Sequence, residues 1–281
     1  MDTYKVVAAL VIYNRRIEES ITYRNIKEFL NINIDLLVVD NSEIKTDNIL
    51  FCKKNNIRYI SMNGNKGLSK AYNIAVDANL DRDVIILLDD DTEISEEYFT
   101  ELFDGIIKHP DVDIFAPFIY GQDGVLYSPN EFHFLKNHLI SSPNQDIKQE
   151  NFNAIASCLA IRMRVFDNYR FNEILFVDQV DQYFFCEQRK RGKKFEKLNV
   201  KITQNFYQRG NVLTPKAGWQ RLKLRIIDIM RHARLMNNVK YILLGYIKCC
   251  GLGIQIGRKS KSIKTFLKAF FLSTKLLIYP Q

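Results

Sequence analysis

Apolar runs alternate with amphipathic segments over residues 6–88 of the chain. Four segments are expected to be strands: Val6–Tyr13, Leu36–Val39, Arg58–Ser61 and Val84–Leu88. Between them, apolar residues recur at helical spacing over residues 17–31, 46–55 and 68–78. Uninterrupted apolar strands are typical of a parallel sheet that is buried on both faces. The alternation therefore predicts a doubly wound α/β domain.

Polar residues follow these strands directly, where each one ends. Asn14 follows the first, Asp40 the second, and Asp89, Asp90 and Asp91 the fourth. Parallel α/β sheets bind ligands in the crevice beyond the carboxyl ends of their strands. The hydropathy pattern thus places the candidate site at this edge of the sheet.

The three consecutive aspartates carry the clearest chemical signal. Side chains alternate along an extended chain, so Asp89 and Asp91 are expected on one side and Asp90 on the other. Adjacent carboxylates repel one another unless a cation neutralises them. Two on one side suit a hard divalent ion that keeps coordination sites for phosphate oxygens. The alternative is a solvated turn before the next helix, with Thr92 or Ser95 as the N-cap.

A second acidic pair lies far downstream, where Asp178 and Asp181 stand three positions apart beside aromatic residues. On a helix the two would share one face, and the aromatic neighbours would withdraw them from water. A carboxylate in such a place is suited to act as a general base. The alternative makes Asp178 the N-cap of an amphipathic helix that ends at Gly192.

Five segments together resemble the motifs of family 2 glycosyltransferases, most closely those of the rhamnosyltransferase and galactofuranosyltransferase branch. They are Val-Ile-Tyr-Asn14, Val-Val-Asp40-Asn-Ser, Asn65-Lys-Gly67-Leu-Ser-Lys-Ala-Tyr-Asn73, Leu-Leu-Asp89-Asp-Asp91 and Phe-Val-Asp178-Gln-Val-Asp181. The match extends over roughly residues 5–210. The resemblance implies a GT-A fold, a nucleoside-diphosphate-sugar donor, a Mn²⁺ or Mg²⁺ ion and inversion at the anomeric carbon.

On the donor side, the resemblance places Asn14 and Asp40 against the nucleoside. It assigns the metal and the diphosphate to Asp89 and Asp91, with Asp90 next to the substrate. The residues implied to line the nucleotide pocket are Asn65, Lys66, Gly67 and Asn73. Lys66 and Lys70 are candidate diphosphate contacts, and the alternative for Lys70 is an exposed helix residue.

On the acceptor side, the family pattern makes Asp181 the general base, with Asp178 in support. Two positions depart from the family: Tyr207 stands where relatives carry a metal-binding His, and Glu187 where they carry an Arg. These departures keep open a non-catalytic nucleotide-sugar-binding or scaffolding subunit as the alternative function. A sugar-nucleotide pyrophosphorylase is disfavoured because residues 11–18 lack a Gly-rich phosphate loop.

Charge divides the chain unevenly. The 281 residues carry 40 Lys and Arg against 32 Asp and Glu, a net charge of +8. Residues 216–281 hold 14 basic residues and one acidic residue, Asp228, whereas residues 1–215 have a net charge of −5. The expected organisation is a GT-A catalytic domain over 1–215, with a nucleotide-binding half at 1–92 and an acceptor half at 93–215, followed by a basic amphipathic helical region at 216–281.

The basic region interleaves Lys and Arg with bulky apolar and aromatic side chains, for example over residues 262–278. Such helices suit an anionic membrane surface. The alternative is a set of helices packed on the catalytic domain with a solvated cationic face. A nucleic-acid-binding motif does not accompany the charge, so nucleic acid is not an expected partner.

The remaining composition narrows the class of protein. The five cysteines are scattered without a CxxC pair, which argues against a disulfide scaffold or a zinc site and suits a reducing cytosol. The run at 6–13 is too short for a transmembrane helix and lacks the features of a signal peptide. The expected location is cytoplasmic and peripheral, at the inner face of a bacterial cell membrane.

These features together predict an inverting, metal-dependent glycosyltransferase. It would move a hexosyl or deoxyhexosyl unit, of the rhamnose or galactose type, to a glycan or lipid-linked glycan acceptor in bacterial surface polysaccharide biosynthesis. Loops such as residues 120–150 are expected to set its specificity, and a homo-oligomer is compatible with the sequence.

Overall fold

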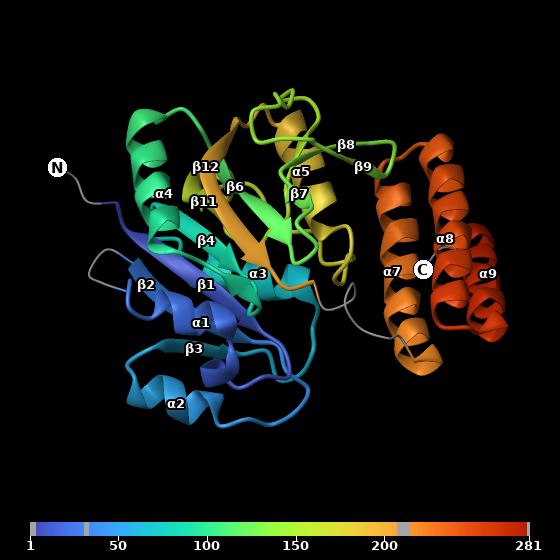
Figure 1. The fold of residues 1–281 in the computed structure, drawn as a ribbon, viewed down its shortest axis with the longest axis horizontal. Coiled ribbons are helices and arrows are strands. Elements are labelled where there is room, and N and C mark those ends of the chain that lie inside the picture. Colours follow the sequence, from blue (N-terminus) through green and yellow to red (C-terminus); the bar gives the residue numbers. More distant parts are fainter. Residues whose placement is uncertain (1–3, 31–33, 207–213, 280–281) are drawn as a thin grey trace.

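The computed structural model describes residues 4–30, 34–206 and 214–279, and its centre is a sheet flanked by helices (Figure 1). The first part of this sheet is four parallel strands in the order β3-β2-β1-β4. Their bounds are Val6–Ile12 (β1), Ile34–Asp40 (β2), Arg58–Ser61 (β3) and Val84–Leu88 (β4). The four predicted strands are confirmed, β3 and β4 with the predicted bounds.

The sheet continues beyond β4 with strands from the second half of the chain. Antiparallel β11 follows β4, then come β6, β12 and β5, while β7 pairs with β6. Their bounds are Thr92–Glu93 (β5), Ile114–Gly121 (β6), Leu126–Ser128 (β7), Leu159–Arg162 (β11) and Phe195–Gln204 (β12). Over the described residues this sheet has nine strands, and β12 runs parallel to β6. The predicted fold class, a mixed and mainly parallel sheet, is confirmed.

Helices cover both faces of the sheet because the side chains of β1 alternate between two apolar cores. Val7, Ala9 and Val11 pack in one core, and the even-numbered positions of β1 pack in the other. The first core includes residues of α3 (Leu68–Asp77) and α5 (Val180–Lys190), and the second includes residues of α1 (Ile21–Ile26), α2 (Asn48–Lys54) and α4 (Glu96–Lys108). Every residue of β1 is buried, as the uninterrupted apolar run predicts.

The segment 17–31, predicted to be one helix, is divided in two. A 3₁₀ helix, η1, spans Ile17–Glu19 and α1 begins at Ile21. Ser20 separates them because its backbone is extended, and its hydroxyl accepts a hydrogen bond from Tyr23 N as the N-cap of α1. The same hydroxyl donates to the backbone carbonyl of Asp90 at 3.0 Å. The interruption therefore ties α1 to the strand edge that carries the acidic residues.

The segment expected to set specificity forms part of a second sheet. The strands of this three-stranded sheet are β8 (Asn130–His133), β9 (Lys136–Leu139) and β10 (Phe152–Asn153). Leu135, in the turn between β8 and β9, packs with Ala233 of the C-terminal helices. A second 3₁₀ helix, η2, spans Met163–Val165 after β11. The second sheet therefore contacts the C-terminal helices.

Three long helices occupy the C-terminal part of the chain. They are α7 (Pro215–Leu235), α8 (Val239–Lys259) and α9 (Ile263–Ile278). They lie side by side at one end of the molecule, with α7 nearest the sheet (Figure 1), and they share an apolar core of their own. The predicted C-terminal helical region is confirmed, while the domain boundary after residue 215 stays a prediction.

Candidate functional site

The three aspartates that follow β4 divide between the two sides of the chain. Gln204, the last residue of β12, donates from Nε2 to Asp89 Oδ2 at 3.0 Å and to Asp91 Oδ1 at 3.3 Å. On the other side, Asp90 Oδ1 lies 3.5 Å from Arg15 Nη1. Asp89 and Asp91 therefore face one space together, as the alternation predicts, and Asp90 faces the end of β1.

The triplet is a half-buried turn, and Ser95 is the N-cap of the following helix α4. Burial raises the pKa of Asp89 well above its usual range, and the charges of Asp91 and Asp181 raise it further. Burial also raises the pKa of Asp91. The alternative of a turn before the next helix is confirmed in part, since Ser95 is the N-cap of α4, although the three aspartates are only partly exposed. Metal binding by the triplet stays a prediction.

Asp181 lies in the first turn of α5. It is near enough to Asp89 for its negative charge to raise the pKa of that carboxyl. Burial raises the pKa of Asp181 itself to about 7, although the backbone N–H of Ala156 donates to its carboxylate. A carboxylate that titrates near neutrality is suited to accept a proton in catalysis.

Asp89 and Asp91 fit a divalent cation. They are two convergent hard oxygen donors whose joint ionisation is unfavourable without a positive charge, and in the described part of the chain neither forms a salt bridge. Residues 4–30, 34–206 and 214–279 contain no group of three His, Cys, Asp or Glu side chains arranged around a metal. Water or ligand oxygens would therefore complete the coordination. Tyr207 lies outside the described residues.

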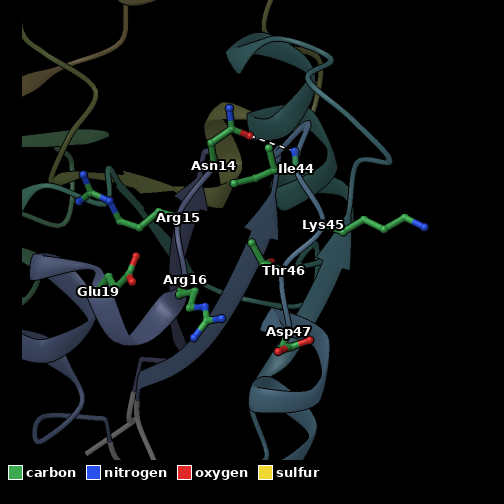
Figure 2. A pocket seen from close by; sticks show the side chains of 8 residues that line it. All are labelled: Asn14, Arg15, Arg16, Glu19, Ile44, Lys45, Thr46 and Asp47. Atoms are coloured by element: carbon green, nitrogen blue, oxygen red, sulfur yellow. Dashed lines mark hydrogen bonds between the residues drawn. The ribbon is translucent and has the colours of Figure 1, made fainter.

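Asn14 folds the end of β1 against the loop that follows β2. Its φ of +50° is in the left-handed region, and its Oδ1 accepts from the backbone N–H of Glu43 at 2.8 Å and of Ile44 at 3.2 Å (Figure 2). A cavity of about 310 Å³ opens beside it, lined by Asn14, Arg15, Arg16, Glu19, Ile44, Lys45, Thr46 and Asp47. The acidic cluster does not line this cavity, but Arg15 borders both.

Asp40, the last residue of β2, is buried and its carboxylate already accepts from several protein donors. Ser42 N donates to Oδ1 at 3.0 Å, while Asn48 Nδ2 at 2.9 Å and Tyr59 OH at 3.0 Å donate to Oδ2. These bonds join the ends of β2 and β3 to the start of α2. Asp40 thus shapes the strand edge from within, and its direct contact with a nucleoside stays a prediction.

The polar side chains of the loop before α3 also bond to protein groups. Asn65 Oδ1 accepts from Gly67 N at 3.1 Å, and the backbone N–H of Lys66 donates to Asn41 Oδ1 at 2.8 Å. Asn73 holds the backbone of Phe171 through both of its amide atoms, at 2.9 Å and 2.8 Å. Asn65 and the backbone of Lys66 therefore position the loop, while Asn73 ties α3 to Phe171. The contacts of these residues with a nucleotide stay predictions.

This loop is tied to the segment that leads into α5. Gly67 has a φ of +93°, and a β-carbon there would lie 2.8 Å from the ring and the carbonyl of Phe176, so only glycine allows this approach. Lys70 Nζ lies 3.8 Å from Glu173 Oε2, and both side chains are about half exposed. This ion pair agrees with the alternative of an exposed helix residue for Lys70.

A side chain of α7 binds the segment of chain that precedes Asp181. The carboxylate of Asp228, which is fully buried, accepts from the backbone N–H of Phe176 at 3.0 Å, Val177 at 2.8 Å and Asp178 at 2.8 Å. Charge-assisted hydrogen bonds of this kind are the strong ones in proteins. A single carboxylate from the basic region therefore fixes three consecutive peptide groups.

Asp178 pairs with two arginines of α7. Arg221 binds its Oδ2 directly, and Arg225 Nε lies 3.7 Å from its Oδ1. The N-cap of α5 is Gln179, with a φ of +64°, and His232 Nδ1 of α7 lies 3.0 Å from its Oε1. The N-cap alternative for Asp178 is therefore wrong. Its negative charge contributes to the raised pKa of the candidate base.

Sequence reasoning did not identify Arg15, Gln204 or Asp228 as site residues. Arg15 directly follows Asn14, so its place at a strand end was a usable signal. Gln204 likewise ends a strand, but its pairing with β5 is not visible in the sequence. Asp228 stands as an isolated acid among Ile and Met, and an isolated charge on an apolar helix face signals a buried partner.

We expect the Asp228→Asn substitution to lower the free energy of unfolding by about 2–4 kcal/mol, because the amide group turns a donor toward backbone donors. Chemical denaturation measures the loss, and hydrogen exchange at residues 176–178 should accelerate. Asp77→Asn is the matched control, since Asp77 pairs with Arg170 at the surface and such pairs contribute about 0–1 kcal/mol. Equal losses in both variants would contradict the structural role of Asp228.

Comparisons with known proteins agree with this architecture. The family model described as "Glycosyl transferase family 2" matches residues 8–170. A curated relative, the "Low-salt glycan biosynthesis hexosyltransferase Agl10" of Haloferax volcanii, is 26% identical over 201 residues, which are 68% of this chain and 63% of the relative. The chain thus spans less than two thirds of the length of that relative.

Solved structures share the fold at low sequence identity. TarS 1–349 of S. aureus has a TM-score of 0.58 at 15% identity and covers 97% of this chain and 81% of its own. The glucosyl-3-phosphoglycerate synthase of Mycobacterium tuberculosis, in complex with Mn²⁺, UDP and phosphoglyceric acid, has a TM-score of 0.54 at 12% identity over 81% of this chain and 78% of its own. The predicted GT-A type of fold is confirmed by these similarities.

Proposed function

The chain belongs to glycosyl transferase family 2, and from this premise we propose that it transfers a sugar unit from a nucleoside-diphosphate donor to a glycan acceptor. The observation that carries the proposal is the convergence of Asp89 and Asp91 on Gln204 at the carboxyl edge of the sheet, with Asp181 near enough for its charge to raise the pKa of Asp89. Two of these carboxylates suit a cation that faces a diphosphate, and the third suits a base.

The proposed reaction is a single displacement at the anomeric carbon of the donor. Asp181 accepts the proton of the acceptor hydroxyl as that oxygen attacks the anomeric carbon. The new carbon–oxygen bond forms while the bond to the diphosphate breaks, and the diphosphate departs with the electron pair. Attack opposite the leaving group inverts the anomeric configuration. Mn²⁺ or Mg²⁺ held by Asp89 and Asp91 would supply positive charge next to the departing diphosphate.

The donor is proposed to lie along the ends of β1 and β2. The cavity beside Asn14, about 310 Å³ in volume, is at the small end of the range for ligand sites. Arg15 is proposed to contact the diphosphate, because its side chain is about one-third exposed and its guanidinium lies next to the aspartate triplet. TarS in complex with UDP has a similar fold, with a TM-score of 0.53, which supports a uridine nucleotide as the first donor class to try.

The sugar and the pathway are the more specific parts of the proposal. A curated relative is named as a hexosyltransferase of glycan biosynthesis, which supports transfer of a hexosyl unit to a glycan. We keep the rhamnose or galactose type and bacterial surface polysaccharide biosynthesis as the proposed specificity and pathway. A lipid-linked acceptor at the inner face of the cell membrane accords with the basic helices at residues 216–281.

The function is tested by the purified chain with Mn²⁺ and a panel of nucleotide sugars. We expect one nucleotide class to raise the melting temperature by roughly 5–10 °C at saturation, and EDTA to remove the increase. Release of the nucleoside diphosphate is then measured with and without a glycan acceptor. Binding without turnover would favour the non-catalytic alternative, and the absence of any shift across the panel would contradict the donor class.

A further inference from the structure

The C-terminal helices pack with one side only. α8 contacts α7 through Gly245, where a β-carbon would lie 2.9 Å from Ala233 Cβ, and contacts α9 through Gly253, where it would lie 2.8 Å from Ala269 Cβ. Because α9 follows α8 directly, the two helices run antiparallel and close together. Small residues allow this approach on the packed side.

The opposite side of both helices is apolar and exposed. Exposed apolar residues recur at spacings of three, four or seven positions, which keeps them on one side of a helix. They are Val239, Leu243, Ile247 and Ile254 on α8, and Ile263, Leu267, Phe270, Phe271 and Ile278 on α9. Ile247 is 65% and Phe271 is 67% exposed. We refer to these nine residues as the outer face.

The packed positions of α8 and α9 indicate that the exposed apolar sides of the two helices point the same way. On α8, Tyr246 and Gly253 contact α9, and the buried Cys249 contacts α7. Ile247 lies on the remaining side of the helix and is exposed. On α9, Ala269 packs inward while Leu267 is 44% exposed. In Figure 1, α7 lies between the sheet and the pair α8 and α9. The outer face is therefore directed away from α7.

The charge around the outer face has one sign. From residue 229 to the end of the chain there is no Asp or Glu, while Lys and Arg recur throughout. Lys240 and Arg258 on α8 and Lys264 and Lys275 on α9 are exposed. An apolar stripe bordered by cations fits an anionic lipid surface, where the apolar side chains enter the acyl boundary and the cations meet the headgroups.

The packing of α8 also indicates whether this helix would lie on a membrane or cross it. In the described part of the chain, α8 is the one helix long and apolar enough to span by length and composition. A spanning α8 would have to leave the β8–β9 turn, where Lys248 binds the carbonyl of Leu135, and α7, against which Cys249 is buried. Exposed side chains on one side of a packed helix suit an in-plane position instead.

We propose that the outer face of α8 and α9 docks on an anionic lipid bilayer with both helices in the membrane plane. This deepens the membrane location proposed above, and rests on no step of the transfer reaction. The positive charge without a counter-charge selects the lipid surface over a second copy of the chain, because two such faces would repel each other.

The test is sedimentation of the full chain with vesicles of phosphatidylcholine alone or with about one-third phosphatidylglycerol. We expect binding to the anionic vesicles that weakens at high salt. Ile247→Ser and Phe271→Ser should each weaken it about tenfold. Leu80→Ser and Ile107→Ser are matched controls, since these side chains are 60% and 65% exposed elsewhere on the molecule, and they should bind like the wild type.

Two results would overturn the proposal. One is equal vesicle binding by the outer-face variants and the controls. The other is a dimer, seen by light scattering, that Phe271→Ser dissociates, because the face would then join two copies. Nucleotide-dependent melting shifts are measured on the same samples. Loss of the shifts with vesicle binding intact counts against the proposed reaction alone, and the reverse counts against the docking surface alone.

Discussion

Replacing Asp181 by Asn is expected to lower the rate of sugar transfer roughly 10²–10⁴-fold. The amide keeps the shape of the side chain and can still accept from Ala156 N, but it cannot take a proton from the acceptor hydroxyl. Nucleotide binding should survive, because the substitution leaves Asp89 and Asp91 in place. The measurement is the initial rate of nucleoside diphosphate release, beside the nucleotide-dependent melting shift. Wild-type turnover in this variant would remove Asp181 from the role of base.

The pH dependence gives this prediction a second signature. Burial raises the pKa of Asp181 to about 7, and only the ionised form accepts a proton, so the wild-type rate should fall as the pH drops through that value. The residual rate of Asp181→Asn should not fall with pH in this range. Since an ionised buried carboxyl costs folding free energy above its raised pKa, the variant should be no less stable than the wild type in mild alkali. Asp111→Asn, at an exposed carboxyl that pairs with Lys194 on the surface, is the control with unchanged turnover.

The second large effect is expected from Asp91→Asn. Losing one of the two carboxylates proposed to hold the metal should remove several kcal/mol of charge stabilisation, which corresponds to a roughly 10²–10³-fold lower transfer rate. The Mn²⁺-dependent part of the melting shift should disappear as well. Titration of Mn²⁺ against turnover and melting temperature measures both.

Asp90→Asn is the matched control for this substitution. Asp90 belongs to the same triplet but faces Arg15 on the opposite side of the chain. Its replacement should therefore keep the Mn²⁺-dependent melting shift. If Asp90→Asn and Asp91→Asn lost that shift equally, the assignment of one side of the triplet to the cation would be wrong.

Local patterns predicted the parts of this protein that depend on neighbours in sequence. The bounds of β3 and β4 and the opposite orientations of Asp90 and Asp91 follow from strand periodicity alone. The helix expected over 17–31 failed because Ser20 bonds to the carbonyl of Asp90, a contact that no local pattern contains.

Predictions of role were weaker where a side chain serves the fold. Asn65 and Asn73 were identified from motif likeness, and Asp40 also from its place at a strand end, and all three bond to protein groups. A motif marks the place of a residue but not the direction of its hydrogen bonds. The candidate nucleoside contacts among them therefore depend on binding experiments.

A count of charges along the sequence does not predict the role of Asp228. By sequence it was the one acid in a basic region, and the count suggested only a location for that region. In the structure the same carboxylate holds the backbone of residues 176–178. Composition cannot distinguish a solvated charge from a buried one, because burial depends on which elements pack together.

The sequence by itself determined the alternation of strands and helices, the aspartates at the strand ends and the separation of an acidic body from a basic tail. These are local or additive properties of the chain. Only the tertiary structure brought Asp181 to Asp89, joined Asp178 to Arg221 and turned the apolar side of α8 and α9 outward. Those arrangements depend on contacts between segments far apart in sequence, and packing of the whole fold selects them.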